Sequence, residues 1–169
     1  MQLAATQLAS HLQQGLHPLY TLHGDEPLLA QEAGDAIRLA ARAAGYVERK
    51  VFTVSGQHFD WSGLLGAAQA MSLFAERQLI EIRIPTGKPG KDGSEALQRY
   101  CAHLSDDVLT IVHLPRLDRQ QMNGAWFGAL AQAVPALAGP LKAYVGFVDS
   151  LRLHLDGLMQ SATVAINGD

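Results

Sequence analysis

The sequence contains a single cysteine, Cys101, among its 169 residues. It can therefore form no internal disulfide and no CxxC metal knuckle, which favours a reducing compartment. It also lacks an excess of basic residues, because 13 Lys and Arg stand against 16 Asp and Glu, giving a formal net charge of −3. A chain without a broad basic surface is not expected to hold nucleic acid by itself.

Long hydrophobic runs are missing as well. No uncharged apolar stretch approaches the roughly 20 residues that cross a bilayer, and the first ten residues lack the basic start and apolar run of a signal peptide. We therefore expect a cytoplasmic protein that makes no membrane contact. The 48% hydrophobic content is enough for the core of one ordinary domain.

Short β-prone runs alternate with helical patterns through the first 134 residues. We expect strands at 18–23, 50–54, 78–84 and 107–113, and helices at 2–14, 25–45, 61–71, 94–104 and 118–133. Asp25 and Asp118 are the expected helix caps, and 85–94 is an expected surface loop. The alternation predicts an α/β fold with a largely parallel sheet.

The pattern weakens after Val134, where Pro135, Gly139 and Pro140 interrupt it. The remaining candidates are a strand at 143–148 and a helix at 151–159. We expect two parts, an α/β domain at 1–134 and a divergent or truncated tail at 135–169.

The first turn between a strand and a helix is where an α/β protein would place a phosphate loop. Counted from Gly24, the motif GxxxxGK[ST] fails at its second glycine, its lysine and its Ser/Thr, which are here Leu29, Ala30 and Gln31. Asp25 and Glu26 would put negative charge beside a phosphate, and Pro27 removes a backbone donor. The turn is typical of a helix start and predicts no nucleotide site.

Other catalytic patterns are absent from the sequence. The seven histidines form no HxxxH or HExxH, and no serine lies in GxSxG. His23 and His113 both end expected strands, so they are either ordinary strand-end residues or a pair brought together at a functional edge. Cys101 fits a small core residue better than a reactive thiol. We expect no catalytic residues, no metal site and no cofactor.

The segment 69–78 carries three large apolar residues, Met71, Leu73 and Phe74, in an expected connection between a helix and a strand. Connections normally lie on the surface. Two interpretations follow: the three side chains fold inward beneath the helix, or they form an exposed wedge for the pocket of a partner.

Three phrases in order, YTLHGDEPLL at 20–29, QAMSLFAERQ at 69–78 and AWFGAL at 125–130, resemble the delta subunit of bacterial DNA polymerase III. The resemblance extends over about residues 3–133 and implies the N-terminal domain of that family. This domain is an AAA+/P-loop-like three-layer α/β module that has lost its nucleotide site. The failed phosphate loop described above agrees with it.

The resemblance also implies a function. The family's delta subunit belongs to the clamp loader, where a Leu-Phe pair enters a hydrophobic pocket on the sliding clamp, the beta subunit, and helps to open the ring for loading onto primed DNA. Carried over to this sequence, the clamp-binding residues are Met71, Ser72, Leu73 and Phe74. The implied partners are the clamp, the tau/gamma and delta prime subunits, and DNA within the complex only. The subunit would not be an enzyme by itself but part of a nucleotidyltransferase holoenzyme.

Two features depart from the family's wider pattern. Many clamp-binding peptides begin with Gln and a hydrophobe, whereas Ala70 stands at the Gln position and Gln69 lies one residue earlier. The sequence also stops before the family's second and third domains, so we expect clamp contact without stable loader assembly. The alternatives are an interaction domain with an unrelated partner and a nucleotide-hydrolysing enzyme, which the residues of the failed phosphate loop oppose.

Overall fold

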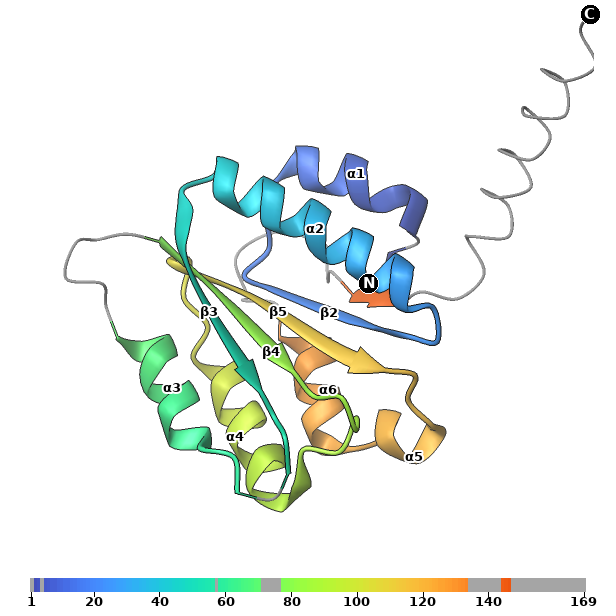
Figure 1. Ribbon diagram of the computed structural model, residues 1–169, viewed down its shortest axis with the longest axis vertical. Coiled ribbons are helices and arrows are strands. Elements are labelled where there is room, and N and C mark those ends of the chain that lie inside the picture. The colour runs from blue at the N-terminus through green and yellow to red at the C-terminus, as the bar shows by residue number, and fades with distance from the viewer. Residues whose placement is uncertain (1, 4, 57, 71–76, 134–143, 147–169) are drawn as a thin grey trace, which may run out of the picture.

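A parallel sheet lies between two helical layers in the computed structural model of the chain (Figure 1). The structure describes residues 2–3, 5–56, 58–70, 77–133 and 144–146. They confirm the expected α/β fold with its parallel sheet. None of the helices in this part of the chain has the length and hydrophobicity that a membrane crossing requires.

The sheet contains six strands of the described residues, and every neighbouring pair runs parallel. In spatial order they are β1 (Gln2–Leu3), β6 (Tyr144–Gly146), β2 (Leu19–Gly24), β5 (Val108–Pro115), β4 (Arg77–Arg83) and β3 (Tyr46–Thr53). Parallel strands all begin at one edge of the sheet and end at the other. We call these the amino edge and the carboxyl edge.

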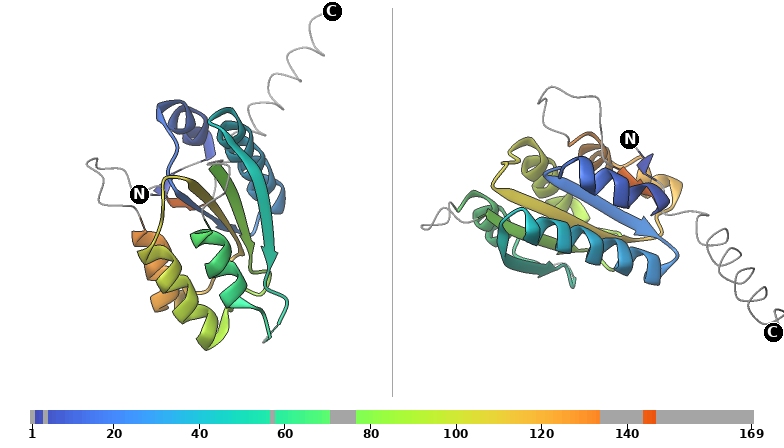
Figure 2. Two further views of the ribbon diagram at one scale, coloured as in Figure 1. Left: turned by 90° about the vertical axis from the view of Figure 1, so that its left-hand side faces the viewer. Right: turned by 90° about the horizontal axis from the view of Figure 1, so that it is seen from above.

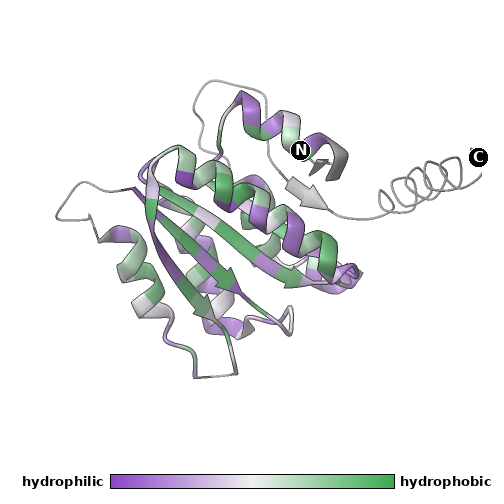
Figure 3. Ribbon diagram, turned by 45° about the horizontal axis from the view of Figure 1, so that its top comes forward, coloured by the Kyte–Doolittle hydropathy of each residue, from purple (hydrophilic) through white to green (hydrophobic). Residues whose placement is uncertain are grey.

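The crossover helices cover both faces of the sheet, as parallel pairing requires. α1 (Ala5–Gln14) and α2 (Pro27–Ala43) lie on one face, and α3 (Trp61–Gln69), α4 (Gly90–Ala102) and α6 (Ala125–Gln132) lie on the other (Figure 2). The short α5 (Arg119–Met122) precedes α6. Figure 3 shows hydrophobic and hydrophilic residues interspersed along α2, as in an amphipathic helix.

Strand β4 divides its side chains between two cores. Leu79 packs into the core beneath α1 and α2, whereas Ile80 and Ile82 pack into the core with α3, α4 and α6. All three are at most 3% exposed. The strand is buried on both faces although Glu81 interrupts its hydrophobic residues, so its sequence alternates in character.

Two boundaries near the start of the chain differ from expectation. The helix expected at 2–14 is wrong at its start, because Gln2–Leu3 form β1 beside β6 and α1 begins only at Ala5. The strand expected at 50–54 begins earlier, at Tyr46. Its side chains alternate between half-buried and exposed, and β3 lies at the edge of the sheet, where charged residues such as Glu48 and Arg49 are tolerated. These charged residues make the first half of the strand difficult to recognise from the sequence.

Two helices also differ. α4 begins at Gly90, within the expected surface loop, and its buried Gly93 lies so close to the Trp61 ring that a Cβ would clash with it. The helix expected at 118–133 is two helices, because Gly124 has an extended backbone and starts α6 in a new direction. The cap at Asp118 is confirmed: its carboxylate accepts from the Gln121 N–H at 2.7 Å, and the Gln121 side chain accepts from the Asp118 N–H at 2.8 Å.

The strand expected at 143–148 is present as β6, Tyr144–Gly146, paired with β1 and β2. β6 therefore belongs to the same sheet as the strands of 1–134. The division of the chain at residue 134 stays a prediction, and the helix expected at 151–159 lies outside the described residues.

Candidate functional site

The carboxyl edge is the usual ligand-binding edge of an α/β sheet. An open hollow of about 830 Å³ lies there, lined by Gly24, Asp25, Pro27, Ala30, Gln31, Arg38, Arg83, Ile84, Pro85, His113, Leu114, Pro115 and Arg116. The hollow lies at the turn from β2 into α2, where an α/β protein that binds nucleotide would have its phosphate loop. Its shape is therefore set by the turn from β2 into α2.

That turn is built as a plain helix start. Glu26 is the N-cap of α2, with an extended backbone and no side-chain cap hydrogen bond, and Pro27 follows it. Leu29 is only 8% exposed and packs in the core beneath α2. The residue at the second glycine position of the motif therefore points into the protein, and Pro27 contributes no backbone donor to a phosphate cradle.

Asp25 does not cap the helix, contrary to expectation. Its carboxylate accepts a hydrogen bond from Arg116 at 3.0 Å, from the loop after β5. The local pattern Asp-x-Pro predicts a helix cap. Asp25 instead forms an ion pair with a residue that is distant in the sequence, which the local pattern does not indicate. This pair of exposed residues spans the mouth of the hollow.

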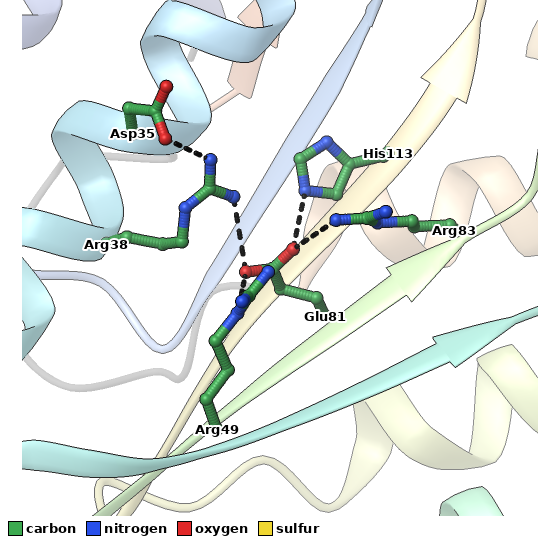
Figure 4. A network of polar contacts seen from close by, with 6 residues as sticks. All are labelled: Asp35, Arg38, Arg49, Glu81, Arg83 and His113. Carbon is green, nitrogen blue, oxygen red and sulfur yellow. Dashed lines mark hydrogen bonds and ion pairs between the residues drawn. The ribbon is translucent and has the colours of Figure 1, made fainter.

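A buried carboxylate lies behind the same hollow. The side chain of Glu81 on β4 is fully buried, and four cationic or potentially cationic side chains converge on it from α2, β3, β4 and β5 (Figure 4). Its Oε1 accepts from Arg38 at 3.2 Å and Arg49 at 2.7 Å, and its Oε2 lies 3.4 Å from both Arg83 and His113. These contacts join three strands and one helix through a single side chain.

The network fixes the charge of Glu81. Burial alone would raise its pKa, but the contact with His113, the hydrogen bond from Arg49 and the charge of Arg38 outweigh burial and hold the pKa well below its ordinary value. A carboxylate with so low a pKa stays ionised at neutral pH and is not suited to general acid catalysis. Arg38 also pairs with Asp35, so its guanidinium is shared between two carboxylates.

The two strand-end histidines do not meet. His23 stacks edge-on against Phe127 of α6 at 5.6 Å, whereas His113 faces Glu81 on the α2 side of the sheet. The interpretation of the two as a pair at one functional edge is therefore wrong. In the β2–β5 register His113 is paired with Leu22, and His23 is the next residue along β2, so the two histidine side chains point to opposite faces of the sheet. Cys101 is half-buried against the core and burial raises its pKa to about 12, which confirms the core interpretation.

Among the described residues no group of His, Cys, Asp or Glu is placed to hold a metal ion. The amino edge remains, where each helix returns the chain to the next strand. The end of α3 and the start of β4 lie at this edge, and the predicted clamp-binding residues Met71, Ser72, Leu73 and Phe74, which come between them in the sequence, lie outside the described residues.

The structure describes both anchors of that segment. On its amino side α3 ends at Gln69, two residues before the expected end, and the Ala70 N–H donates to Gly66 O at 2.8 Å. On its carboxyl side Gln78 is 3% exposed, and its amide nitrogen donates to the carbonyls of Ala67 at 3.0 Å and Ala70 at 3.3 Å. The start of β4 is thereby joined to the end of α3.

Arg77 provides a second anchor at the same point. Its guanidinium donates to Ala44 O at 3.2 Å and lies 5.4 Å from the ring centre of Tyr46, a cation–π contact. Tyr46 in turn donates its hydroxyl to Asp106 O at 2.7 Å. Sequence analysis missed Gln78 and Tyr46, because their roles depend on contacts between elements; a glutamine at the start of a hydrophobic strand is the one local signal.

The parallel sheet between two helical layers defines a three-layer α/β protein. An ordinary helix start, at Glu26 and Pro27, occupies the position of a phosphate loop. The family model described as "DNA polymerase III, delta subunit" matches residues 20–137, more than half of the chain. The chain belongs to this family.

Two relatives support the assignment. The DNA polymerase III subunit delta of Escherichia coli is 40% identical over 131 residues, covering 78% of this chain and 38% of the relative. That of Haemophilus influenzae is 33% identical over 129 residues, covering 76% of this chain and 37% of the relative. The chain thus spans less than two fifths of the length of these relatives.

A solved structure shares the fold. The Bacillus subtilis DNA clamp loader delta protein (YqeN) superposes with a TM-score of 0.60 at 20% identity, covering 83% of this chain and 41% of that one. At this identity the likeness concerns the fold alone.

Proposed function

We propose that this chain is the clamp-binding part of a bacterial clamp loader and that Leu73 and Phe74 insert into a hydrophobic pocket of the sliding clamp, with Met71 and Ser72 beside them. The observation that carries the proposal is family membership over the stretch that contains this segment. The Escherichia coli relative is named as a subunit of DNA polymerase III, and the Bacillus subtilis structure as a clamp loader delta protein.

The anchors of the segment support an exposed wedge. Gln78 ties Ala70 to β4 and Arg77 ties the strand start to Ala44, so the six residues between Ala70 and Arg77 have fixed ends. Fixed ends lower the ordering cost that a binding loop otherwise incurs. The inward alternative would compete with a core that Leu64, Leu65 and Ala68 of α3 already occupy.

Binding would favour opening only if the wedge has a higher affinity for the open ring than for the closed ring. The chain itself performs no catalysis in this proposal; it needs no nucleotide and no metal. Its remaining partners are the tau/gamma and delta prime subunits, and it reaches DNA only within the complex.

The proposal is tested by titrating the chain into the sliding clamp in a calorimeter. We expect binding by the native chain and loss of binding by the double variant L73A/F74A, with Glu95→Ala, at an exposed position of α4, as a control near the native affinity. Circular dichroism confirms that each variant is folded. Equal binding by the native chain and the double variant overturns the wedge, and no binding by a folded native chain overturns the clamp as partner and favours an unrelated one.

A further inference from the structure

A wedge of two side chains is too small to be the whole contact. Burying one Leu and one Phe contributes about 3–6 kcal/mol before ordering costs, whereas a micromolar complex needs roughly 8 kcal/mol. A specific protein interface also covers about 800 Å² and some 20–30 residues on each partner. A clamp that binds the segment 71–76 must therefore touch the described surface on one side of it.

Two of the hollows formed by described residues lie at the amino edge. One lies between α3 and α4, is lined by residues including Leu65, Ala68 and His103, and has a volume of only about 10 Å³. That is room for about one water molecule and not for a side chain. The other lies where α1 and α2 end and β3 begins, and its volume is about 640 Å³. We call the second one the α1–α2 hollow.

The α1–α2 hollow has a mixed lining, in which apolar side chains stand beside polar groups. Leu12 and Leu16 approach it from α1 and the loop after it, Ala40 and Ala43 from α2, and Tyr46 from β3, while Arg77 and Asp106 stand at its rim. Leu12, Leu16, Ala40 and Tyr46 are half-buried and Ala43 is exposed. A lining of this mixed kind favours an apolar side chain of a partner together with a hydrogen-bonding group beside it.

Arg77 links the rim of the hollow to the segment. Arg77 is the residue directly after 71–76, and its contacts with Ala44 and Tyr46 hold it across the hollow. A chain of six residues spans at most about 20 Å. Because Arg77 lines the hollow, a protein that binds the residues between Ala70 and Arg77 also lies within reach of the hollow. The hollow is thus continuous with the surface where the clamp would bind.

We propose that the α1–α2 hollow is a second contact for the sliding clamp: it receives an apolar side chain of the clamp, and Arg77 donates a hydrogen bond to an acceptor beside that side chain. The inference rests on the proposed function, because the clamp is its occupant. The binding free energy that Leu73 and Phe74 do not supply would then come from the α2 side of the amino edge and not from the α3–α4 side.

Two alanines provide a matched test. Ala43 is the last residue of α2 and lines the hollow, whereas Ala102 is the last residue of α4, at the same edge but outside both hollows. Both are exposed, and an arginine at a helix C-terminus is compatible with the helix dipole. Ala43→Arg fills the hollow, and Ala102→Arg adds the same side chain elsewhere.

In calorimetric titration of the full chain into the clamp, we expect Ala43→Arg to weaken binding at least tenfold and Ala102→Arg to change it less than twofold. Leu16→Ala, which removes part of the apolar lining without adding bulk, should weaken binding about threefold. Thermal melts confirm that each variant is folded. Native-like binding by Ala43→Arg, or equal weakening by both arginine variants, overturns the hollow while leaving the Leu73 and Phe74 wedge in place.

The failures are distinguishable. If the native chain does not bind the clamp at all, the proposed function fails and this inference falls with it. If the native chain binds, L73A/F74A does not, and the hollow variants bind normally, only the second contact is overturned. If the hollow variants abolish self-association of the chain instead, the occupant is a second copy and the clamp assignment is overturned.

Discussion

The side-chain amide of Gln78 hydrogen-bonds the backbone carbonyl of Ala70 at 3.3 Å, across the segment that separates them. Because the same amide also reaches Ala67, one buried side chain joins the last turn of α3 to the start of β4. The candidate clamp-binding segment therefore leaves and re-enters the fold at two points that are held together.

Replacing Gln78 tests this anchor. Gln78→Ala removes hydrogen bonds to the carbonyls of Ala67 and Ala70 in a buried setting, so we expect a loss of about 1–3 kcal/mol in the free energy of unfolding. Clamp affinity should fall several-fold as the segment's ends separate. Urea denaturation and calorimetric titration measure the two effects. The exposed Gln69→Ala serves as a control, and unchanged clamp affinity in a destabilised Gln78→Ala chain would remove the anchor's role in binding.

The Glu81 network should stabilise the fold without serving the clamp. Glu81→Gln takes the charge from a buried carboxylate that Arg38, Arg49 and Arg83 approach, and we expect it to cost about 2–4 kcal/mol of unfolding free energy. Glu48→Gln, which breaks an exposed pair with Lys50, should cost less than about 1 kcal/mol. Urea titrations of the two variants provide the comparison. Equal losses would contradict a special role for Glu81.

Acid should destabilise the chain in two stages. Burial lowers the pKa of His11, His17 and His23 below 6.5, so the unfolded chain takes up protons first, and stability falls as the pH drops below about 6.5. The pKa of Glu81 lies below its ordinary 4.5, so further stability is lost as the pH falls from about 5 toward the folded pKa.

Unfolding free energies from urea at pH 7, 6, 5 and 4 measure both stages. Glu81→Gln should remove much of the loss below pH 5 and leave the loss between pH 7 and 5 unchanged. His23→Leu should instead reduce the upper stage. A constant free energy from pH 7 to 4 in the native chain would show that these groups do not couple to folding.

The carboxyl edge should not bind nucleotide. Leu29 is buried, Pro27 lacks an N–H, and Ala30 and Gln31 stand at the lysine and Ser/Thr positions of a phosphate loop, so the turn into α2 cannot cradle a triphosphate. Titration with ATP and magnesium at millimolar concentration should give no heat of binding, and an ATPase assay no turnover above buffer. Saturable binding with a dissociation constant below about 1 mM would revive the nucleotide-binding alternative.

Much of the fold could be predicted because its signals are local. The hydrophobic run in β5 identifies a strand buried on both faces, the alternating residues of β4 identify a second strand, and the cap at Asp118 depends only on Gln121 three residues later. Family resemblance added the candidate segment. These signals needed no knowledge of which elements pack together.

The remaining features depend on distant partners. β1 forms only because β6 lies beside it, and Asp25 pairs with Arg116 from the loop after β5 instead of capping α2. The roles of Gln78 and Tyr46 likewise arise where separate elements meet. Such contacts leave no periodicity or spacing in the sequence, so local rules could not find them.

We propose that the sliding clamp binds at the amino edge through Leu73 and Phe74. Hydrogen–deuterium exchange of the chain with and without the clamp tests this binding site most directly. We expect slower exchange of amides in 70–77 and at the end of α2 upon binding, with no change in 24–31 at the carboxyl edge. Protection confined to 24–31, or binding that leaves 70–77 unprotected, would contradict it.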